Sequence, residues 1–311
     1  MKRPPSTFAV SLTPFREDGD LDESALRAHL RRLAAAGIGI YLGGSGSGEG
    51  HVLSHDERGQ LFAWARDEVR GKVPLRAMGV EPRSATEAIE LGRQVDESGL
   101  DAMQLYSLDL GHGYRPRPEE IETYLRDALE GISCAVVLSS HQAMGYALDP
   151  GLVTRLLTDY PQIIGINFTN ADPEARRLML EAIDGRIELH VGGPMQALAA
   201  LDEGAHGYLS SEGNLAPRLC VRVIESHQQG DLAARDAAHA TVMTLFGETQ
   251  RQGGMSATKG ALGRLGLAGG WPRRPRLPVA EAAARSLSDC FERLGLVESE
   301  EIAAYRSGSP A

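Results

Sequence analysis

The sequence predicts a (β/α)8 barrel with a C-terminal helical extension, a fold of the α/β class. Between residues 8 and 211, short apolar segments of strand length alternate with longer segments of helical pattern. The short segments are apolar on both faces, which is typical of strands that are covered on both sides. Eight such units at even spacing favour a closed parallel barrel, although the pattern leaves a doubly wound sheet open as the alternative.

Eight segments are expected to form the strands of the barrel. In chain order they are residues 8–12, 38–42, 73–79, 102–106, 134–138, 163–167, 187–192 and 207–211. Gly37, Gly99 and Gly204 each separate a helical segment from the next strand, where a left-handed backbone ends a helix without a side-chain clash. Helix starts are expected at capping pairs, which are Ser54 with Glu57, Ser84 with Glu87, Asp149 with Pro150, and Asp172 with Pro173.

The strand pattern stops at about residue 230, and only helical patterns follow it. We therefore expect a barrel over residues 1–230 and a helical extension over residues 231–311. A barrel of roughly 200–250 residues with an extension is compatible with the length of the chain.

The composition is that of a soluble globular protein. The 311 residues carry a formal charge of −10, and such an acidic surface argues against nucleic acid or an anionic membrane as a partner. Cys134, Cys220 and Cys290 are far apart and suggest no disulfide framework, which favours a reducing compartment. The N-terminal segment lacks the apolar core of a signal peptide, so a cytoplasmic location is expected.

Polar residues gather at the carboxyl ends of the expected strands, where barrels of this class hold their active sites. The loop GGSGSGEG at 43–50 is the clearest case, because glycines let backbone N–H groups approach a ligand and serines add hydroxyl donors. It predicts a site for a carboxylate or a phosphate, with a flexible turn as the alternative. The other polar residues at these ends include Tyr106, His112, Tyr114, Ser139, Ser140, His141, Asn167, Thr169, His190 and Ser210.

Three histidines lie on different loops that could converge. They are His112, His141 and His190, and no HxH or HxxxH spacing supports a metal site among them. Each is therefore interpreted as a surface or ligand-bonding histidine, and neither a metal nor another cofactor is expected.

Five segments together resemble the dihydrodipicolinate synthase / N-acetylneuraminate lyase family of Schiff-base aldolases. They are SLTPFREDGDLD (11–22), GSGSGEGHVLSHDE (44–57), IIGINFT (163–169), GYLSSEGNLAP (207–217) and SATKGALGRLGL (256–267). The resemblance covers nearly the whole chain in the same order. It implies a (β/α)8 barrel with C-terminal helices, a homo-oligomer (a dimer or tetramer), and a small-molecule carboxylate as substrate.

The resemblance also indicates a departure at the residue on which the family's chemistry depends. In the family the sixth strand carries a lysine that forms an iminium with a keto acid. Here the position is Asn167, whose amide nitrogen is delocalised into its carbonyl and cannot act as an amine nucleophile. The chain's lysines are Lys2, Lys72 and Lys259, and none is an obvious substitute.

Further departures agree with this one. The family's proton-shuttling tyrosine falls on Leu138, and its tyrosine pair falls within 107–114, where no pair exists. The family's G-T-T-G-E loop becomes S-G-S-G-E at 45–49, which keeps Glu49 but has a glycine at Gly46 in place of a hydroxyl.

The resemblance and its departures predict a lyase- or hydratase-type enzyme that works without a Schiff base. Asn167 would donate a hydrogen bond to a carbonyl or a developing oxyanion, and His141, or Tyr114 with His112, would be the general acid and base. Substrate-binding residues are expected to be Ser45, Gly46, Ser47, Glu49, Tyr106, Ser139, Ser140, Thr169, Gly192 and Ser210. The alternative is a catalytically silent relative that binds a small metabolite or a partner subunit.

Overall fold

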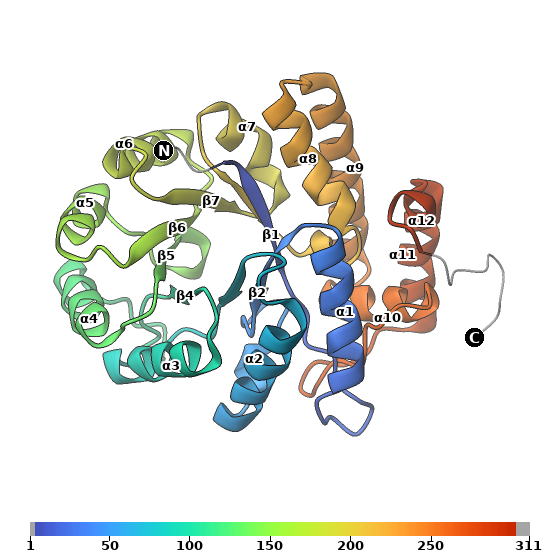
Figure 1. The fold of residues 1–311 in the computed structure, drawn as a ribbon, viewed down its shortest axis with the longest axis horizontal. Coiled ribbons are helices and arrows are strands. Elements are labelled where there is room, and N and C mark those ends of the chain that lie inside the picture. Colours follow the sequence, from blue (N-terminus) through green and yellow to red (C-terminus); the bar gives the residue numbers. More distant parts are fainter. Residues whose placement is uncertain (1–3, 303–311) are drawn as a thin grey trace.

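The structure is a computed structural model that describes residues 4–302, and it confirms the predicted (β/α)8 barrel (Figure 1). Parallel strands pair in sequence order, and the barrel closes where β8 pairs with β1. The strands are β1 (Ser6–Val10), β2 (Gly39–Leu42), β3 (Leu75–Ala77), β4 (Ala102–Leu105), β5 (Val136–His141), β6 (Ile163–Thr169), β7 (Glu188–Gly192) and β8 (Gly207–Ser210).

Helices surround the strands, as the alternating pattern predicts (Figure 1). They are α1 (Glu23–Ala35), α2 (His55–Val69), α3 (Ala85–Ser98), α4 (Pro118–Gly131), α5 (Pro150–Asp159), α6 (Pro173–Ile183), α7 (Ala197–Asp202) and α8 (Pro217–Gln229). Short 3-10 helices follow some strands and are η1 (Gly50–Val52), η2 (Gln142–Met144), η3 (Pro194–Gln196) and η4 (Glu212–Asn214).

Most strand ends differ from the expected ones by one to three residues, and two of the differences have a clear local reason. The first strand excludes Leu12, because its backbone N–H donates to Oδ1 of Asn214 at 2.9 Å and has no neighbouring strand. β5 and β6 run further than expected, to His141 and Thr169, because these residues continue to pair with each other.

The helix boundaries follow the capping signals with one exception. Ser54 and Glu57 form the predicted capping box, with side-chain-to-backbone bonds of 3.2 and 2.9 Å. At α3 the box is only half formed, because Ser84 caps Glu87 but the Glu87 carboxylate accepts from the backbone N–H of Arg83 instead. The glycines expected to end helices all have positive φ, and they are Gly37, Gly99 and Gly204.

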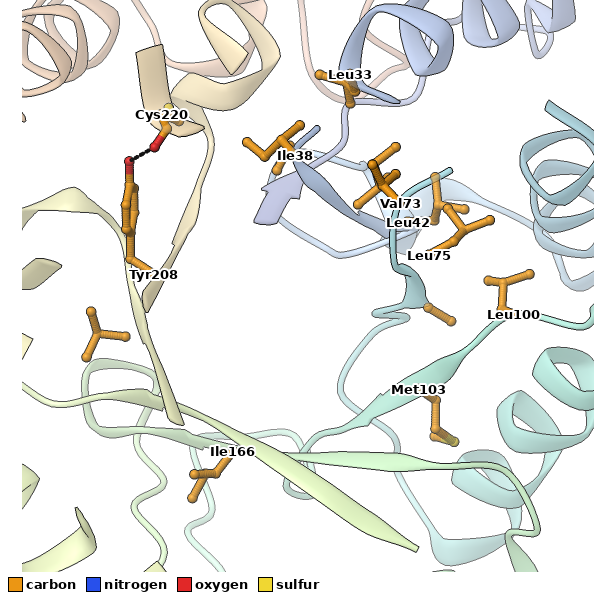
Figure 2. Packing of buried hydrophobic residues seen from close by; sticks show 14 of the residues in the cluster. Leu33, Ile38, Leu42, Val73, Leu75, Leu100, Met103, Ile166, Tyr208 and Cys220 are labelled. Carbon is orange, nitrogen blue, oxygen red and sulfur yellow. Dashed lines mark hydrogen bonds between the residues drawn. The ribbon is translucent and has the colours of Figure 1, made fainter. Parts of the chain in front are cut away.

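Apolar side chains form two separate packing layers. The large outer layer lies between strands and helices, and Figure 2 shows Leu75, Met103 and Ile166 within it. Tyr208 ties β8 to α8 in this layer by donating its hydroxyl hydrogen to the Cys220 carbonyl at 3.2 Å (Figure 2). The small inner layer consists of Phe8, Tyr41, Met78, Tyr106, Tyr146 and Leu209.

The predicted C-terminal extension consists of helices, with a non-helical segment over residues 265–280. It contains α9 (Leu232–Arg251), α10 (Met255–Arg264), α11 (Glu281–Arg293) and α12 (Leu296–Ser299). α9 packs on α8 and α10 packs on α11, and Figure 1 shows these helices on the side of the barrel that carries α1 and α8. Within residues 4–302, no helix is both long enough and apolar enough to cross a membrane.

Candidate active site at the barrel mouth

Asn167 lies inside the barrel on β6, where its side chain is only 3% exposed. Its amide nitrogen donates to Oε1 of Gln104 and, at 3.4 Å, to the hydroxyl of Tyr41. Its carbonyl oxygen is buried and has no hydrogen-bond partner among the described residues. Asn167 was predicted to donate a hydrogen bond to the ligand. In the structure its amide hydrogens are directed to Gln104 and Tyr41, and the atom without a described partner is its carbonyl oxygen, an acceptor.

A buried ion pair lies beside this amide. Arg76 of β3 donates to Glu188 of β7 at 2.8 Å, and its guanidinium lies 4.4 Å from the centroid of the Phe8 ring. Arg76 also donates to the Tyr41 hydroxyl at 3.4 Å, so Tyr41 connects the ion pair to Asn167. This cluster was not predicted from the sequence, although an arginine inside an otherwise apolar strand is a visible signal.

The segment after β5 brings to the mouth a tyrosine, Tyr146, that was not predicted from the sequence. Ser139 stands in register with Asn167, and its hydroxyl lies 3.3 Å from that of Tyr146. Burial raises the pKa of the Tyr146 phenol, which therefore remains protonated at neutral pH. The predicted tyrosine position, Leu138, packs in the outer layer instead. The hydroxyl of Ser140 accepts from the backbone N–H of Leu148 at 3.0 Å.

His141 ends β5 and is half-buried. Burial lowers the pKa of its imidazole, while the negative charge of Glu81 opposes that shift. Nδ1 of His141 is buried and has no partner in the described part of the chain. A neutral imidazole with one unused nitrogen is suited to accept a proton at neutral pH.

Tyr114 and His112 lie on the exposed loop that precedes α4. The Tyr114 hydroxyl donates to the Glu120 carboxylate at 3.0 Å, and the Tyr114 side chain is 51% exposed. His112 is exposed and has a left-handed backbone with φ of 48°. Among the described residues, no hydrogen bond joins either of them to His141, so their predicted role as acid and base stays a prediction.

The Gly-Ser loop at 43–50 is compact and fixed. A Cβ on Gly50 would lie 2.0 Å from the carbonyl oxygen of Gly43, so no larger residue fits there without a backbone shift. Thr13 donates to the Gly48 carbonyl at 2.7 Å, and Arg276 of the extension donates to the Gly46 carbonyl at 3.0 Å. The loop is therefore packed against both the barrel and the C-terminal extension.

Glu49 anchors this loop to the C-terminal extension. Its side chain is fully buried and accepts from the Lys259 ammonium and from the backbone N–H of Arg273 at 2.9 Å. Lys259 also donates to the carbonyl oxygens of Thr13 and Trp271 at 2.7 and 2.8 Å. The three N–H groups of the ammonium thus have three acceptors. Burial lowers the pKa of Lys259 to about 8, and Glu49 opposes that shift.

A cavity of about 490 Å³ lies beside β4, between the segment after β3 and helices α2 and α3. Ser45 and Tyr106, both predicted, line it together with Gln104 and Glu81, which the sequence analysis missed. Ser45 donates its hydroxyl hydrogen to Oε2 of Glu81 at 3.2 Å. Glu81 lies four residues after the end of β3, so the rule that barrel sites lie at strand ends points to its loop.

The remaining predicted residues lie at the ends of β6, β7 and β8. Gly192 and Thr169 are adjacent, because a Cβ on Gly192 would lie 2.2 Å from the Thr169 hydroxyl. Ser210 is buried and donates to Oε2 of Glu212 at 3.1 Å, so its hydroxyl serves the β8 turn. Ser47 is buried in the Gly-Ser loop.

In the described ranges, no three His, Cys, Asp or Glu residues are grouped so that they could hold a metal.

Comparison with known proteins is consistent with this geometry. Residues 5–294 match the model of the Dihydrodipicolinate synthetase family. The chain belongs to that family. A 4-hydroxy-tetrahydrodipicolinate synthase of Methanopyrus kandleri is 28% identical over 289 residues, which cover 92% of this chain and 95% of that protein. The synthase of Nitrobacter hamburgensis is 26% identical over 292 residues, covering 94% and 97%.

Solved structures of the dihydrodipicolinate synthetase family share the fold. The dihydrodipicolinate synthase of Thermotoga maritima superposes with a TM-score of 0.85 at 20% identity, covering 94% of this chain and 99% of that one. The N-acetylneuraminate lyase of Fusobacterium nucleatum superposes with a TM-score of 0.83 at 22% identity, covering 94% and 98%. At these identities the likeness describes the fold and leaves the reaction open.

Proposed function

We propose that this protein is a lyase- or hydratase-type enzyme that acts on a small carboxylate-bearing metabolite without a lysine Schiff base. The observation that carries the proposal is Asn167, which stands inside β6 where the resemblance places the family's lysine and is bonded to Gln104 and Tyr41. An amide bonded in this way can orient a ligand but cannot form an iminium.

Lys259 is a lysine near the mouth, and its environment supports the proposal that no Schiff base forms. All three N–H groups of the Lys259 ammonium are bonded, and its side chain is 1% exposed. A nucleophilic amine must be neutral and accessible, and Lys259 is neither while it holds Glu49. Lys72 lies at the surface after α2, where it donates to the Glu68 carbonyl.

The remaining polar groups fit acid–base chemistry on a bound carboxylate. The substrate would lie over Asn167 with its carboxylate toward Ser47 of the Gly-Ser loop. His141 is suited to take a proton, and the protonated Tyr146 phenol beside Ser139 is suited to donate one. Dehydration, hydration and enolisation use such a pair, whereas retro-aldol cleavage would in addition need a metal to stabilise the enolate. The relatives named as synthases and lyases support a lyase-type reaction in general terms.

Borohydride trapping with pyruvate tests the central claim. We expect no mass adduct on the wild-type protein, whereas Asn167→Lys provides the control in which an amine occupies the same position. A trapped wild-type adduct would refute the proposal, and Lys259 would be the first residue to map.

A screen of metabolites against two variants tests the assigned roles. We expect a modest loss of turnover in Asn167→Ala and a severe loss in His141→Ala. If both variants retain full activity, the roles are wrong. If ligands stabilise the protein without any turnover, the catalytically silent relative replaces the enzyme.

We also propose a homo-oligomer, either a dimer or a tetramer, as the resemblance implies. One solved relative is described as a monomeric dihydrodipicolinate synthase variant, so family membership alone does not fix the state. Light scattering of the purified chain gives the answer directly, and a single monomeric species would contradict this proposal.

A further inference from the structure

We infer that two copies of this chain associate through a surface made of two segments: the basic segment (residues 271–278) of the C-terminal extension and the acidic loop (residues 16–23) before α1. The pairing is two-fold, so the basic segment of each copy faces the acidic loop of the other. It rests on the proposed function only through the homo-oligomer, whose contact surface it names, and it is independent of the lyase chemistry.

The two segments lie side by side at one edge of the barrel, next to the start of α1 (Figure 1). The backbone N–H of Trp271 donates to the carbonyl of Phe15 at 2.7 Å, and the N–H of Phe15 donates to the carbonyl of Trp271 at 3.3 Å. The guanidinium of Arg273 lies 4.2 Å from the centroid of the Phe15 ring and donates to the Gly19 carbonyl at 2.6 Å. The acidic loop and the basic segment are therefore held together as one surface.

The two segments carry opposite charges. The basic segment has three arginines and no acidic residue, whereas the acidic loop has five carboxylates and a single arginine. A net charge of −10 opposes the association of two copies in general, so a basic segment on such a chain selects the face on which they meet. Because the two signs lie next to each other, a two-fold rotation brings each onto its opposite, as a symmetric dimer requires.

The charges in this surface are not used up within one copy. Arg274 and Glu17 are exposed, and within residues 4–302 neither has a hydrogen-bond or ion-pair partner. Arg276 lies 4.0 Å from Glu49, but that carboxylate is already paired with Lys259. Positive charge on the basic segment and negative charge on the acidic loop thus remain available to a second copy.

The same surface has an apolar part. Leu277 is 62% exposed and Trp271 is 44% exposed, and beside them lies a cavity of about 530 Å³ lined by Phe15, Trp271, Pro278 and Val279 among others. An exposed tryptophan and an aliphatic side chain next to a hollow, with arginines at the rim, have the composition of a protein–protein interface. Leu277 of one copy enters this cavity of the other.

Sedimentation velocity over a range of protein concentrations tests the apolar contact. We expect the wild-type chain to self-associate and Leu277→Asp to raise the dissociation constant by about tenfold or more, with unchanged circular dichroism. Leu178→Asp makes the same change on α6, where Leu178 is 41% exposed, and should associate like the wild type. Unchanged association of Leu277→Asp, or an equal loss in Leu178→Asp, overturns the inference.

A charge exchange tests the two-fold pairing. We expect Arg274→Glu and Glu17→Lys to self-associate weakly when each is alone, because in each the two facing segments repel. Mixed in equal amounts they should associate as the wild type does, because both contacts of the mixed dimer then join opposite charges. Failure of the mixture to associate better than the separate variants would contradict the pairing.

The fluorescence of Trp271 reports whether this surface is covered. The chain has two tryptophans, so Trp64→Phe leaves Trp271 as the single one. We expect acrylamide to quench Trp271 less as the protein concentration rises, and this protection to disappear when Leu277→Asp is added. An oligomer with an equally quenched Trp271 overturns this inference alone, whereas a monomeric wild-type chain overturns the proposed homo-oligomer as well. The lyase proposal is decided separately, by borohydride trapping and the metabolite screen.

Discussion

Lys259 of α10 and Glu49 of the loop after β2 form an ion pair whose side chains are 1% and 0% exposed. Each charge was removed from water on folding, so each depends on the other for compensation. The pair joins the carboxyl end of the barrel to the C-terminal extension, and it fixes Glu49 in a left-handed backbone with φ of 51°.

Removing one partner of this pair should destabilise the protein strongly. In Lys259→Met the buried Glu49 carboxylate loses its nearest cation, and we expect a decrease of about 3–5 kcal/mol in the free energy of unfolding. Urea unfolding followed by circular dichroism measures it. Lys72→Met is the matched control, because Lys72 is exposed and should change stability by less than about 0.5 kcal/mol. Equal stability of the two variants would contradict the structural role of the pair.

The compact Gly-Ser loop should tolerate a methyl group at one glycine and reject it at another. Gly50→Ala places a carbon 2.0 Å from the Gly43 carbonyl oxygen, whereas Gly46→Ala meets no atom within 4 Å. We expect Gly50→Ala to lose about 1–3 kcal/mol, with a lower Tm, and Gly46→Ala to keep the wild-type Tm within about a degree. A Gly46→Ala protein as unstable as Gly50→Ala would indicate a different loop conformation.

Acid stability should depend on the contact between Glu57 and Arg273. The Arg273 guanidinium lowers the pKa of Glu57 to about 2. A carboxyl group whose pKa is lower in the folded state stabilises the protein at pH values above its unfolded pKa of 4.5. This stabilisation is lost as the pH falls from 4.5 through about 2. We expect Arg273→Gln to remove roughly 2 kcal/mol of this pH-dependent stability. Unfolding curves of both proteins at pH 6 and pH 3 measure this difference. An equal loss of unfolding free energy at both pH values would contradict a role for the Glu57–Arg273 contact in acid stability.

The pKa of His141 should report the charge of Glu81. Burial lowers this pKa, and the Glu81 carboxylate partly opposes the shift. Glu81→Gln should therefore lower the pKa of His141 further. An NMR titration, with the imidazole signal assigned from the missing peak of His141→Gln, follows the change. A pKa that stays constant or rises would place Glu81 away from His141.

The fold was predictable from sequence because its signals are local and repeated. The Ser54 capping box and the glycines that end helices are each determined by a few neighbouring residues, and the structure confirms them. Strand ends were less predictable. The side-chain oxygen of Asn214 accepts a hydrogen bond from the backbone N–H of Leu12. The two residues are 202 positions apart, so no local pattern reveals the contact.

The candidate site was only partly predictable, for a related reason. Asn167 and Ser45 were named because strand ends and glycine loops are visible in the sequence. Tyr146 was missed because it reaches the mouth by pairing back onto His141, beyond the end of the expected strand. The direction of the Asn167 amide depends on Gln104, which is 63 positions away and comes from another strand.

The pairing of Glu49 with Lys259 also determines when the mouth is completed during synthesis. The two residues are 210 positions apart, so every strand of the barrel is made before the lysine leaves the ribosome. Until then the Glu49 carboxylate lacks its cation, and its loop lacks the contacts made by the C-terminal extension. A nascent or truncated chain that ends before α10 therefore contains all eight strands but lacks a finished ligand-binding end.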